Sequence, residues 1–175
     1  MSDPHPLVAF YRDGAPDDAN RTLAQILAWD DRRLESIHDY IQWLFPLPER
    51  SGANPSAPTL DDATIAAFRS TPMMRDSLRQ AFLRMLRFYG LAWTDGPAPN
   101  VTRSANFAVR SQEWLSPMNH NHLRLTRILR SLRLLGLEAE SAALFRALDA
   151  IHQEFPGRIT ERTFDYWKEA AAAKL

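Results

Sequence analysis

Histidine and carboxylate side chains are considered first, because they bind metal ions and transfer protons near neutral pH. Glu35 and His38 are three residues apart, and so are Asp149 and His152. In a helix this spacing places a carboxylate and an imidazole on one face, as in di-iron helical bundles. Such a site needs two further carboxylates from facing helices, and only one of these pairs is a true Glu-x-x-His unit. We therefore interpret both pairs as surface residues and predict no metal site.

A second group of polar residues surrounds the predicted start of a helix at Asn119. Free backbone N–H groups and the helix dipole favour an anion at such a start. The alternative is that these residues only cap the helix and hydrogen-bond to the preceding loop. The candidate ligand-binding residues are Arg110, Trp114, His120, Asn121, His122, Arg124 and Arg127.

Charge is distributed unevenly along the chain, although the formal net charge is zero. From Arg69 to Arg133 there are eleven arginines against three acidic residues, a local charge of +8. Residues 1–68 hold five basic and eleven acidic residues, and residues 134–175 hold five and seven. If the arginines share one face, they form a surface for phosphate or nucleic acid. The alternative is that they pair with the acidic flanks.

Aromatic side chains concentrate in the segment 38–51, which reads HDYIQWLFPLPERS. Tyr40, Trp43 and Phe45 lead into two prolines and are candidates to line an apolar groove for a peptide. The alternative is a rigid corner that packs the rings into the core, and the sequence favours it because large aromatic rings dominate protein cores.

The residues and motifs that the sequence lacks exclude several kinds of scaffold, metal site and enzyme. Cysteine is absent, which excludes disulfide scaffolds, thiolate zinc sites, iron–sulfur clusters and cysteine nucleophiles. The six glycines are too dispersed for a dinucleotide fingerprint or a P-loop, and no nucleophile elbow or His-Glu-x-x-His occurs. We identify no catalytic residue and expect no cofactor. A phosphoryl-transfer enzyme using His120 or His122 as an acid–base group ranks last.

Helical periodicity positions these residues, because apolar side chains recur every three or four residues along most of the chain. The clearest helix starts at Pro72, after Thr71 as the N-cap, and stops at Gly90. Asn119 caps another long helix that Gly136 ends. The other helices are two between residues 23 and 45, and one each over roughly 59–70, 107–115, 144–155 and 160–171.

These elements predict an all-α fold, a single compact domain of six to eight helices packed as an irregular bundle. Residues 1–20 are predicted to be an N-terminal extended segment, with any extended structure around Leu7 to Tyr11. Residues 21–175 are predicted to be the helical domain. The start lacks the basic residues and apolar centre of a signal peptide, and no stretch approaches the roughly 20 apolar residues of a membrane span. We expect a soluble, cytoplasmic protein without integral membrane association.

Three motifs carry a resemblance to a known family, namely HDYIQWLFPLPERS (38–51), RFYG (87–90) and NHNHLRLTRILRSLRLLG (119–136). In this order and at this separation they resemble the conserved domain of the opioid growth factor receptor family, over roughly residues 20–155. The resemblance implies a helical, receptor-type protein. The eukaryotic relatives are implied to bind Met-enkephalin, to lie in and around the nucleus and to restrain cell growth. Nineteen of the 21 basic residues are arginine, which indicates a short bacterial member.

We weigh two hypotheses for the function. The first is a binding module of the opioid growth factor receptor type, with a peptide or an anionic ligand. The second is a nucleic-acid or phosphate-binding protein that uses the arginine-rich surface of residues 69–133. Ionic strength separates them, because phosphate contacts weaken steeply with salt and apolar peptide contacts do not.

Overall fold

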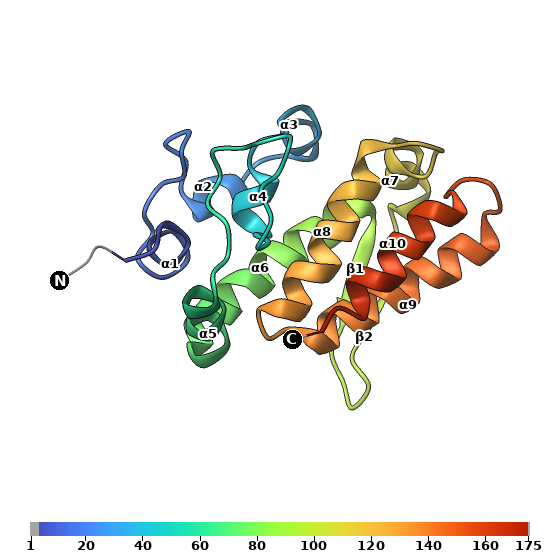
Figure 1. Ribbon diagram of the computed structural model, residues 1–175. Helices are drawn as coiled ribbons and strands as arrows, with labels where there is room; N and C mark the ends of the chain where they lie inside the picture. The colour runs from blue at the N-terminus through green and yellow to red at the C-terminus, as the bar shows by residue number, and fades with distance from the viewer. Residues whose placement is uncertain (1–3, 175) are drawn as a thin grey trace. The chain divides into compact units, whose positions relative to one another are not determined.

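A computed structural model describes residues 4–174 of the chain (Figure 1). The chain forms two compact units, whose boundary in the sequence lies between Ala81 and Phe82. The long helix α6 (Pro72–Tyr89) begins in the first unit and ends in the second. Of the predicted segments 1–20 and 21–175, residues 1–3 and 175 lie outside the described part.

Within the described residues, the first unit contains five short helices before α6. Four of them begin at side-chain caps, and in three of these Thr22, Asp30 or Asp61 accepts a hydrogen bond from the backbone amide three residues on. The five helices are α1 (Pro6–Arg12), α2 (Leu23–Leu27), α3 (Asp31–Ser36), α4 (Ile41–Leu44) and α5 (Asp62–Ser70).

The segment from Leu7 to Tyr11, predicted to be extended, is helical instead. His5 caps α1 by accepting a hydrogen bond from the amide of Leu7, and Pro6 occupies the first helical turn. Leu7, Phe10 and Tyr11 recur at helical spacing and are buried. Because this helix packs against α5, the apolar residues gain more from a helical face than from an isolated extended segment.

The sequence predicts two helices between residues 23 and 45, whereas the structure has three there, namely α2, α3 and α4. Ile37 is in an extended conformation and ends α3, and α4 begins four residues later. The hydroxyl of Tyr40 donates to the carbonyl of Leu34 at 2.9 Å, which fixes the bend between α3 and α4. The aromatic ring of Tyr40 also packs edge-on against Trp29.

The second unit is built around three long helices that contact one another (Figure 1). Leu125, Leu129 and Leu132 of α8 are fully buried in its core. The hydroxyl of Ser141 on α9 donates to the backbone carbonyl of Leu129 at 2.8 Å. After α6, this unit contains β1 (Leu91–Thr94), β2 (Asn100–Arg103), α7 (Phe107–Trp114), α8 (His120–Leu134), α9 (Glu138–Glu154) and α10 (Glu161–Ala171).

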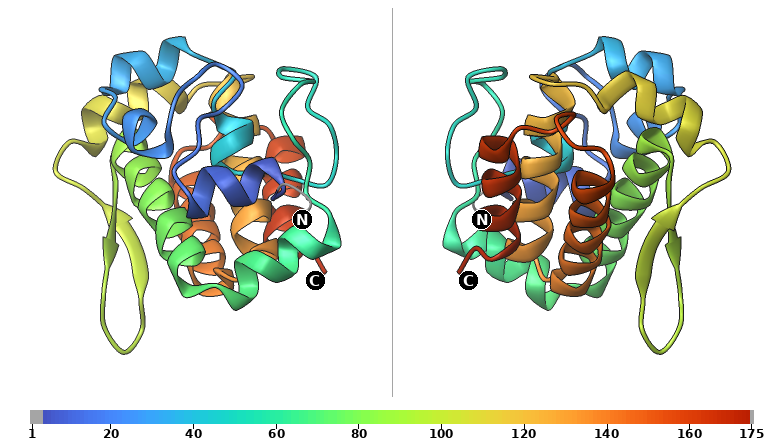
Figure 2. Two further views of the ribbon diagram at one scale, coloured as in Figure 1. Left: turned by 90° about the vertical axis from the view of Figure 1, so that its left-hand side faces the viewer. Right: turned by 90° about the vertical axis from the view of Figure 1, so that its right-hand side faces the viewer.

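A two-stranded antiparallel hairpin accompanies these helices, with Leu91 opposite Arg103 and Thr94 opposite Asn100. Its tip extends away from the helices of its unit (Figure 2). The hairpin is absent from the sequence prediction, because each strand has only four residues and shows no clear alternation of buried and exposed positions. The predicted all-α class is confirmed apart from this hairpin. Residues 4–174 form ten helices rather than six to eight.

None of the helices in the described part of the chain combines the length and the apolar character needed to cross a lipid bilayer.

Candidate functional site

The predicted site at the start of α8 is organised by Asn119, which caps the helix. Its side-chain oxygen accepts a hydrogen bond from the amide of Asn121 at 2.9 Å. Its side-chain nitrogen donates to the backbone carbonyl of Glu113 at 2.9 Å and to the hydroxyl of Ser116 at 3.2 Å. One side chain therefore caps the helix and ties it to the preceding loop, which is the alternative role considered for this segment.

His122 lies in the core of the second unit, with only 3% of its surface exposed. Its Nε2 donates to the carbonyl of Trp114 at 2.9 Å. Its own backbone carbonyl accepts from Nε1 of Trp167 at 3.0 Å, and the two rings pack edge-on. Burial lowers the pKa of His122, which is opposed by the hydrogen bond to Trp114. The ring therefore joins α7, α8 and α10 in its neutral form.

Arg110 and Trp114 point at the end of α6 rather than at open solvent. Nε of Arg110 donates to the carbonyl of Phe88 at 2.8 Å, and its guanidinium lies over the Phe88 ring. Nε1 of Trp114 donates to the carbonyl of Tyr89 at 3.0 Å. Since the last carbonyls of a helix carry its negative dipole end, these donors cap α6.

The remaining predicted residues on α8 differ in exposure. Asn121 and Arg124 are buried, and Nη1 of Arg124 donates to the Asn121 side chain at 3.3 Å. His120 is exposed and Arg127 is half-buried. The structure thus brings Trp114 and His122 together in the core.

The arginines of residues 69–133 mostly have partners within the chain. Arg75 donates to the carbonyl of Arg69 at the end of α5, and Arg133 donates to the carbonyl of Ala173 just after α10. Arg103 forms a fork with the carboxylate of Glu154. Five more also take part in interactions, namely Arg69, Arg79, Arg84, Arg127 and Arg130. With Arg110 and Arg124, ten of the eleven arginines therefore take part in at least one interaction.

These contacts explain why charge counting gave limited information about the surface. A sequence shows that a guanidinium is present, but not whether it reaches a carboxylate or the carbonyl end of a helix. Arg75, Arg110 and Arg133 each bind backbone carbonyls near a helix end. The alternative of pairing with acidic flanks applies to Arg103, which binds Glu154 of α9.

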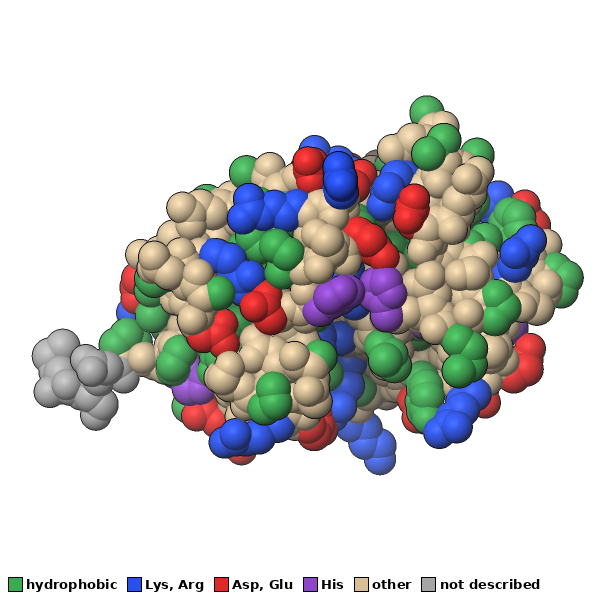
Figure 3. All heavy atoms as spheres, turned by 90° about the horizontal axis from the view of Figure 1, so that it is seen from above, with side chains coloured by type: hydrophobic (Ala, Val, Ile, Leu, Met, Phe, Trp, Pro, Cys, Tyr) green, Lys and Arg blue, Asp and Glu red, His purple; other side chains and the backbone are tan. Residues whose placement is uncertain are grey.

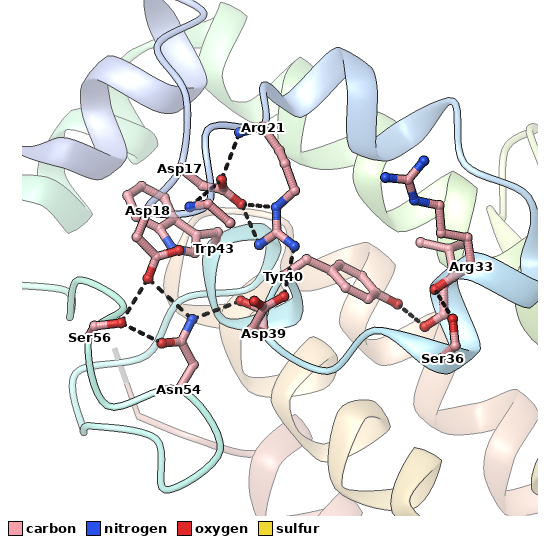
Figure 4. Close-up of polar contacts among 12 residues, drawn as sticks. Asp17, Asp18, Arg21, Arg33, Ser36, Asp39, Tyr40, Trp43, Asn54 and Ser56 are labelled. Carbon is pink, nitrogen blue, oxygen red and sulfur yellow. Dashed lines mark hydrogen bonds and ion pairs between the residues drawn. The ribbon is translucent and has the colours of Figure 1, made fainter.

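The aromatic residues of the segment 38–51 are buried in the first unit, where Tyr40 and Phe45 are 0% and Trp43 is 5% exposed. Nε1 of Trp43 donates to the carboxylate of Asp18 at 3.1 Å (Figure 4). The ring of Trp43 lies 5.3 Å from that of Phe10, measured between centroids. These rings act as a packed corner.

Polar contacts fix the loop that follows this corner (Figure 4). The side-chain nitrogen of Asn54 donates to the carbonyl of Asp39 at 2.8 Å, and the hydroxyl of Ser56 donates to Asp18 at 2.9 Å. Arg21 pairs with Asp17 at 2.7 Å and with Asp39 at 2.8 Å. Side chains of the proline-rich loop therefore hold it in place by binding both a backbone carbonyl of the aromatic corner and the side chain of Asp18.

Comparison with known proteins identifies the family. The model of the opioid growth factor receptor (OGFr) conserved region matches residues 9–174. The chain belongs to this family. The human opioid growth factor receptor is 38% identical over 151 residues, which cover 83% of this chain and 22% of that protein. The mouse opioid growth factor receptor is 44% identical over 120 residues, covering 67% of this chain and 19% of that protein.

A second group of relatives, the opioid growth factor receptor-like proteins, is similar to the chain over a comparable length. Mouse opioid growth factor receptor-like protein 1 is 37% identical over 142 residues, covering 81% of this chain and 29% of that protein. The chain therefore spans about a fifth to three tenths of the length of these curated relatives. No solved structure matches it.

The motifs that carried the resemblance to the opioid growth factor receptor family have clear structural roles. Residues 38–51 form the aromatic corner, residues 87–90 end α6, and residues 119–136 contain α8. Several positions in these motifs are buried in this chain, among them Trp43, Tyr89 and His122.

Exposed apolar side chains in the second unit were not selected from the sequence. Met118 is 89%, Leu123 is 69%, Val109 is 65% and Tyr166 is 39% exposed. Figure 3 shows hydrophobic side chains exposed among polar and charged ones on the face that it draws. In the sequence, Leu123 shares a helical face with Arg127 and Arg130. An apolar residue on such a charged face is a sequence signal for an exposed apolar side chain.

Proposed function

We propose that this chain is a ligand-binding module of receptor type, and that its ligand is a peptide with apolar side chains. The observation that carries the proposal is a contrast within the second unit. Its arginines largely have partners, whereas Met118 and Leu123 are mostly exposed. Covering apolar surface contributes about 25 cal/mol per Å² of binding free energy before the costs of association.

Family membership supports the same proposal. The curated relatives are named as receptors for an opioid growth factor, and we extend a ligand of that kind to this chain. The binding of nucleic acid or phosphate by the surface of residues 69–133 has less support. A phosphate group would have to displace existing partners from the guanidinium groups of five of these arginines, namely Arg75, Arg103, Arg110, Arg124 and Arg133.

Fluorescence anisotropy tests the proposal with labelled Met-enkephalin and with labelled single- and double-stranded oligonucleotides. The peptide should bind, and its affinity should change by less than about threefold between about 50 and 200 mM salt, because apolar contacts are weakly screened. Oligonucleotides should bind weakly or not at all.

Two results would contradict this proposal. Absence of peptide binding at both salt concentrations would overturn a receptor role for Met-enkephalin-like peptides. Oligonucleotide binding that weakens by about a hundredfold or more over the same salt range would instead support the arginine-rich surface.

A further inference from the structure

One hydrogen bond fixes how α8 and α10 are aligned along their axes. Nε1 of Trp167 donates to the carbonyl of His122 at 3.0 Å, so the two residues lie at one level of the helix pair. Their sequence neighbours Tyr166 and Leu123 lie at the same level, and both side chains are exposed. Met118 is in the loop immediately before α8 and is also exposed.

We infer that Met118, Leu123 and Tyr166 form the docking surface for the peptide ligand, and that Arg162 binds a carboxylate of that peptide. This inference rests on the proposed function and assigns its location and chemistry.

The three apolar side chains suit a peptide. Methionine is flexible and polarizable, and it adapts to varied apolar partners. The tyrosine ring offers an apolar face together with a hydroxyl group. Met118 also has a φ of 60°, a left-handed conformation that non-glycine residues rarely adopt. The fold therefore holds an 89% exposed apolar side chain on a strained backbone, and such strain is concentrated at ligand-binding segments.

Arg162 gives the surface its preference for a carboxylate. Its Nε donates to the hydroxyl of Tyr166 at 2.9 Å, and its guanidinium lies 5.7 Å from the centre of the Tyr166 ring. Within residues 4–174 its two terminal amino groups have no hydrogen-bond partner. They can therefore bind a carboxylate with two parallel hydrogen bonds while Nε keeps the ring in place.

Acidic residues near Arg162 favour a ligand that carries only one or a few negative charges. Asp165 and Glu169 are exposed on the same helix as Arg162. They repel a polyanion such as nucleic acid, whose phosphates would extend along α10. A peptide with apolar side chains beside a single carboxylate, such as its own C-terminus, fits the apolar and charged groups together.

Binding measurements on the full chain test this surface. The probes are labelled Met-enkephalin with a free C-terminal carboxylate and the same peptide as a C-terminal amide. Leu123→Ser and Tyr166→Ala should each weaken binding of both probes by about tenfold or more, as expected for central contacts of an interface. Arg162→Gln should weaken binding of the free-carboxylate peptide only, because the amide carries no charge at that end.

Two matched variants control for general effects. Val109→Ser removes a comparably exposed apolar side chain from α7, and Lys168→Gln removes an exposed positive charge from α10. Both should bind like the wild type, and circular dichroism should show that every variant is folded. Unchanged binding in Leu123→Ser and Tyr166→Ala would overturn this surface while leaving the proposed function intact. A wild-type chain that fails to bind either probe would overturn the proposed function itself.

Discussion

His122 illustrates at the residue scale how a motif that resembles a site becomes part of the core. Because a carbonyl can only accept, the contact with Trp114 requires a proton on Nε2. Nδ1 is then unprotonated, and it has no hydrogen-bond partner among the described residues. A second proton on this ring would be buried without an acceptor, which is unfavourable.

This arrangement predicts a loss of stability on mild acidification. Burial lowers the pKa of His122 in the folded chain below the usual value of about 6.5, so the unfolded chain takes up the proton first as the pH falls. The free energy of unfolding should be flat above about pH 7 and should fall from about pH 6.5 to the lowered pKa. Chemical denaturation between about pH 7.5 and 5 measures this change.

Variants of two neighbouring histidines test the assignment. His122→Gln keeps a side-chain N–H donor but cannot titrate, so it should flatten the pH dependence even though it is less stable overall. His120 lies two positions before His122 in α8 and is exposed, and His120→Gln should keep most of the wild-type pH dependence. If both variants lose stability with acid as the wild type does, His122 is not the responsible group.

Gly90 shows at the element scale how one turn joins α6 to the hairpin and α7. Its φ is +76°, which favours glycine. A Cβ atom at this position would lie 2.8 Å from Cα of Phe107 and 2.9 Å from Cβ of Arg110. Two separate costs therefore oppose any side chain here, the left-handed backbone and the close approach of α7.

Gly157 separates these two costs, because its φ is +77° and no atom lies within 4 Å of the equivalent Cβ. Gly157→Ala should lower the free energy of unfolding by about 1–2 kcal/mol from backbone strain alone. Gly90→Ala should lower it by a further 1–3 kcal/mol or so, because α7 must move to admit the methyl group. Equal losses in denaturant titrations would contradict the close contact with α7.

The sequence predicted the elements that have strong local signals. α6 and α8 begin and end within a residue or so of the predicted positions, because Pro72, Asn119 and the glycines at 90 and 136 act through their immediate neighbours. The hairpin was missed because its short strands are stabilised by pairing across the turn and by contact with α9. Such contacts leave no periodic pattern.

The candidate site was predictable to a smaller extent, because exposure depends on distant contacts. His122 is covered by Trp167, which is 45 residues away in the sequence. Arg133 reaches Ala173, 40 residues away. The α8 sequence identifies a cap and a polar first turn, but only the packing of α10 determines that His122 is buried and Leu123 is exposed.

At the scale of the whole molecule, the two units differ in how their helices are stabilised. The helices α2 and α3 of the first unit have five and six residues, so they contain few internal hydrogen bonds. Side-chain contacts such as those of Arg21 and Asn54 stabilise the chain around them. In the second unit α8 and α9 have 15 and 17 residues and share a continuous apolar core.

This difference predicts unequal hydrogen exchange. Amides in the centre of α8 should exchange about a hundredfold more slowly, or slower still, than those of α2 and α3, because the latter open locally without disrupting a large core. Hydrogen–deuterium exchange with mass spectrometry at neutral pH resolves the two regions as separate peptides. Arg21→Gln should accelerate exchange in residues 23–36 and leave α8 unchanged, since its ion pairs lie within the first unit. Equal exchange rates in the two regions would mean that the chain opens only as a whole.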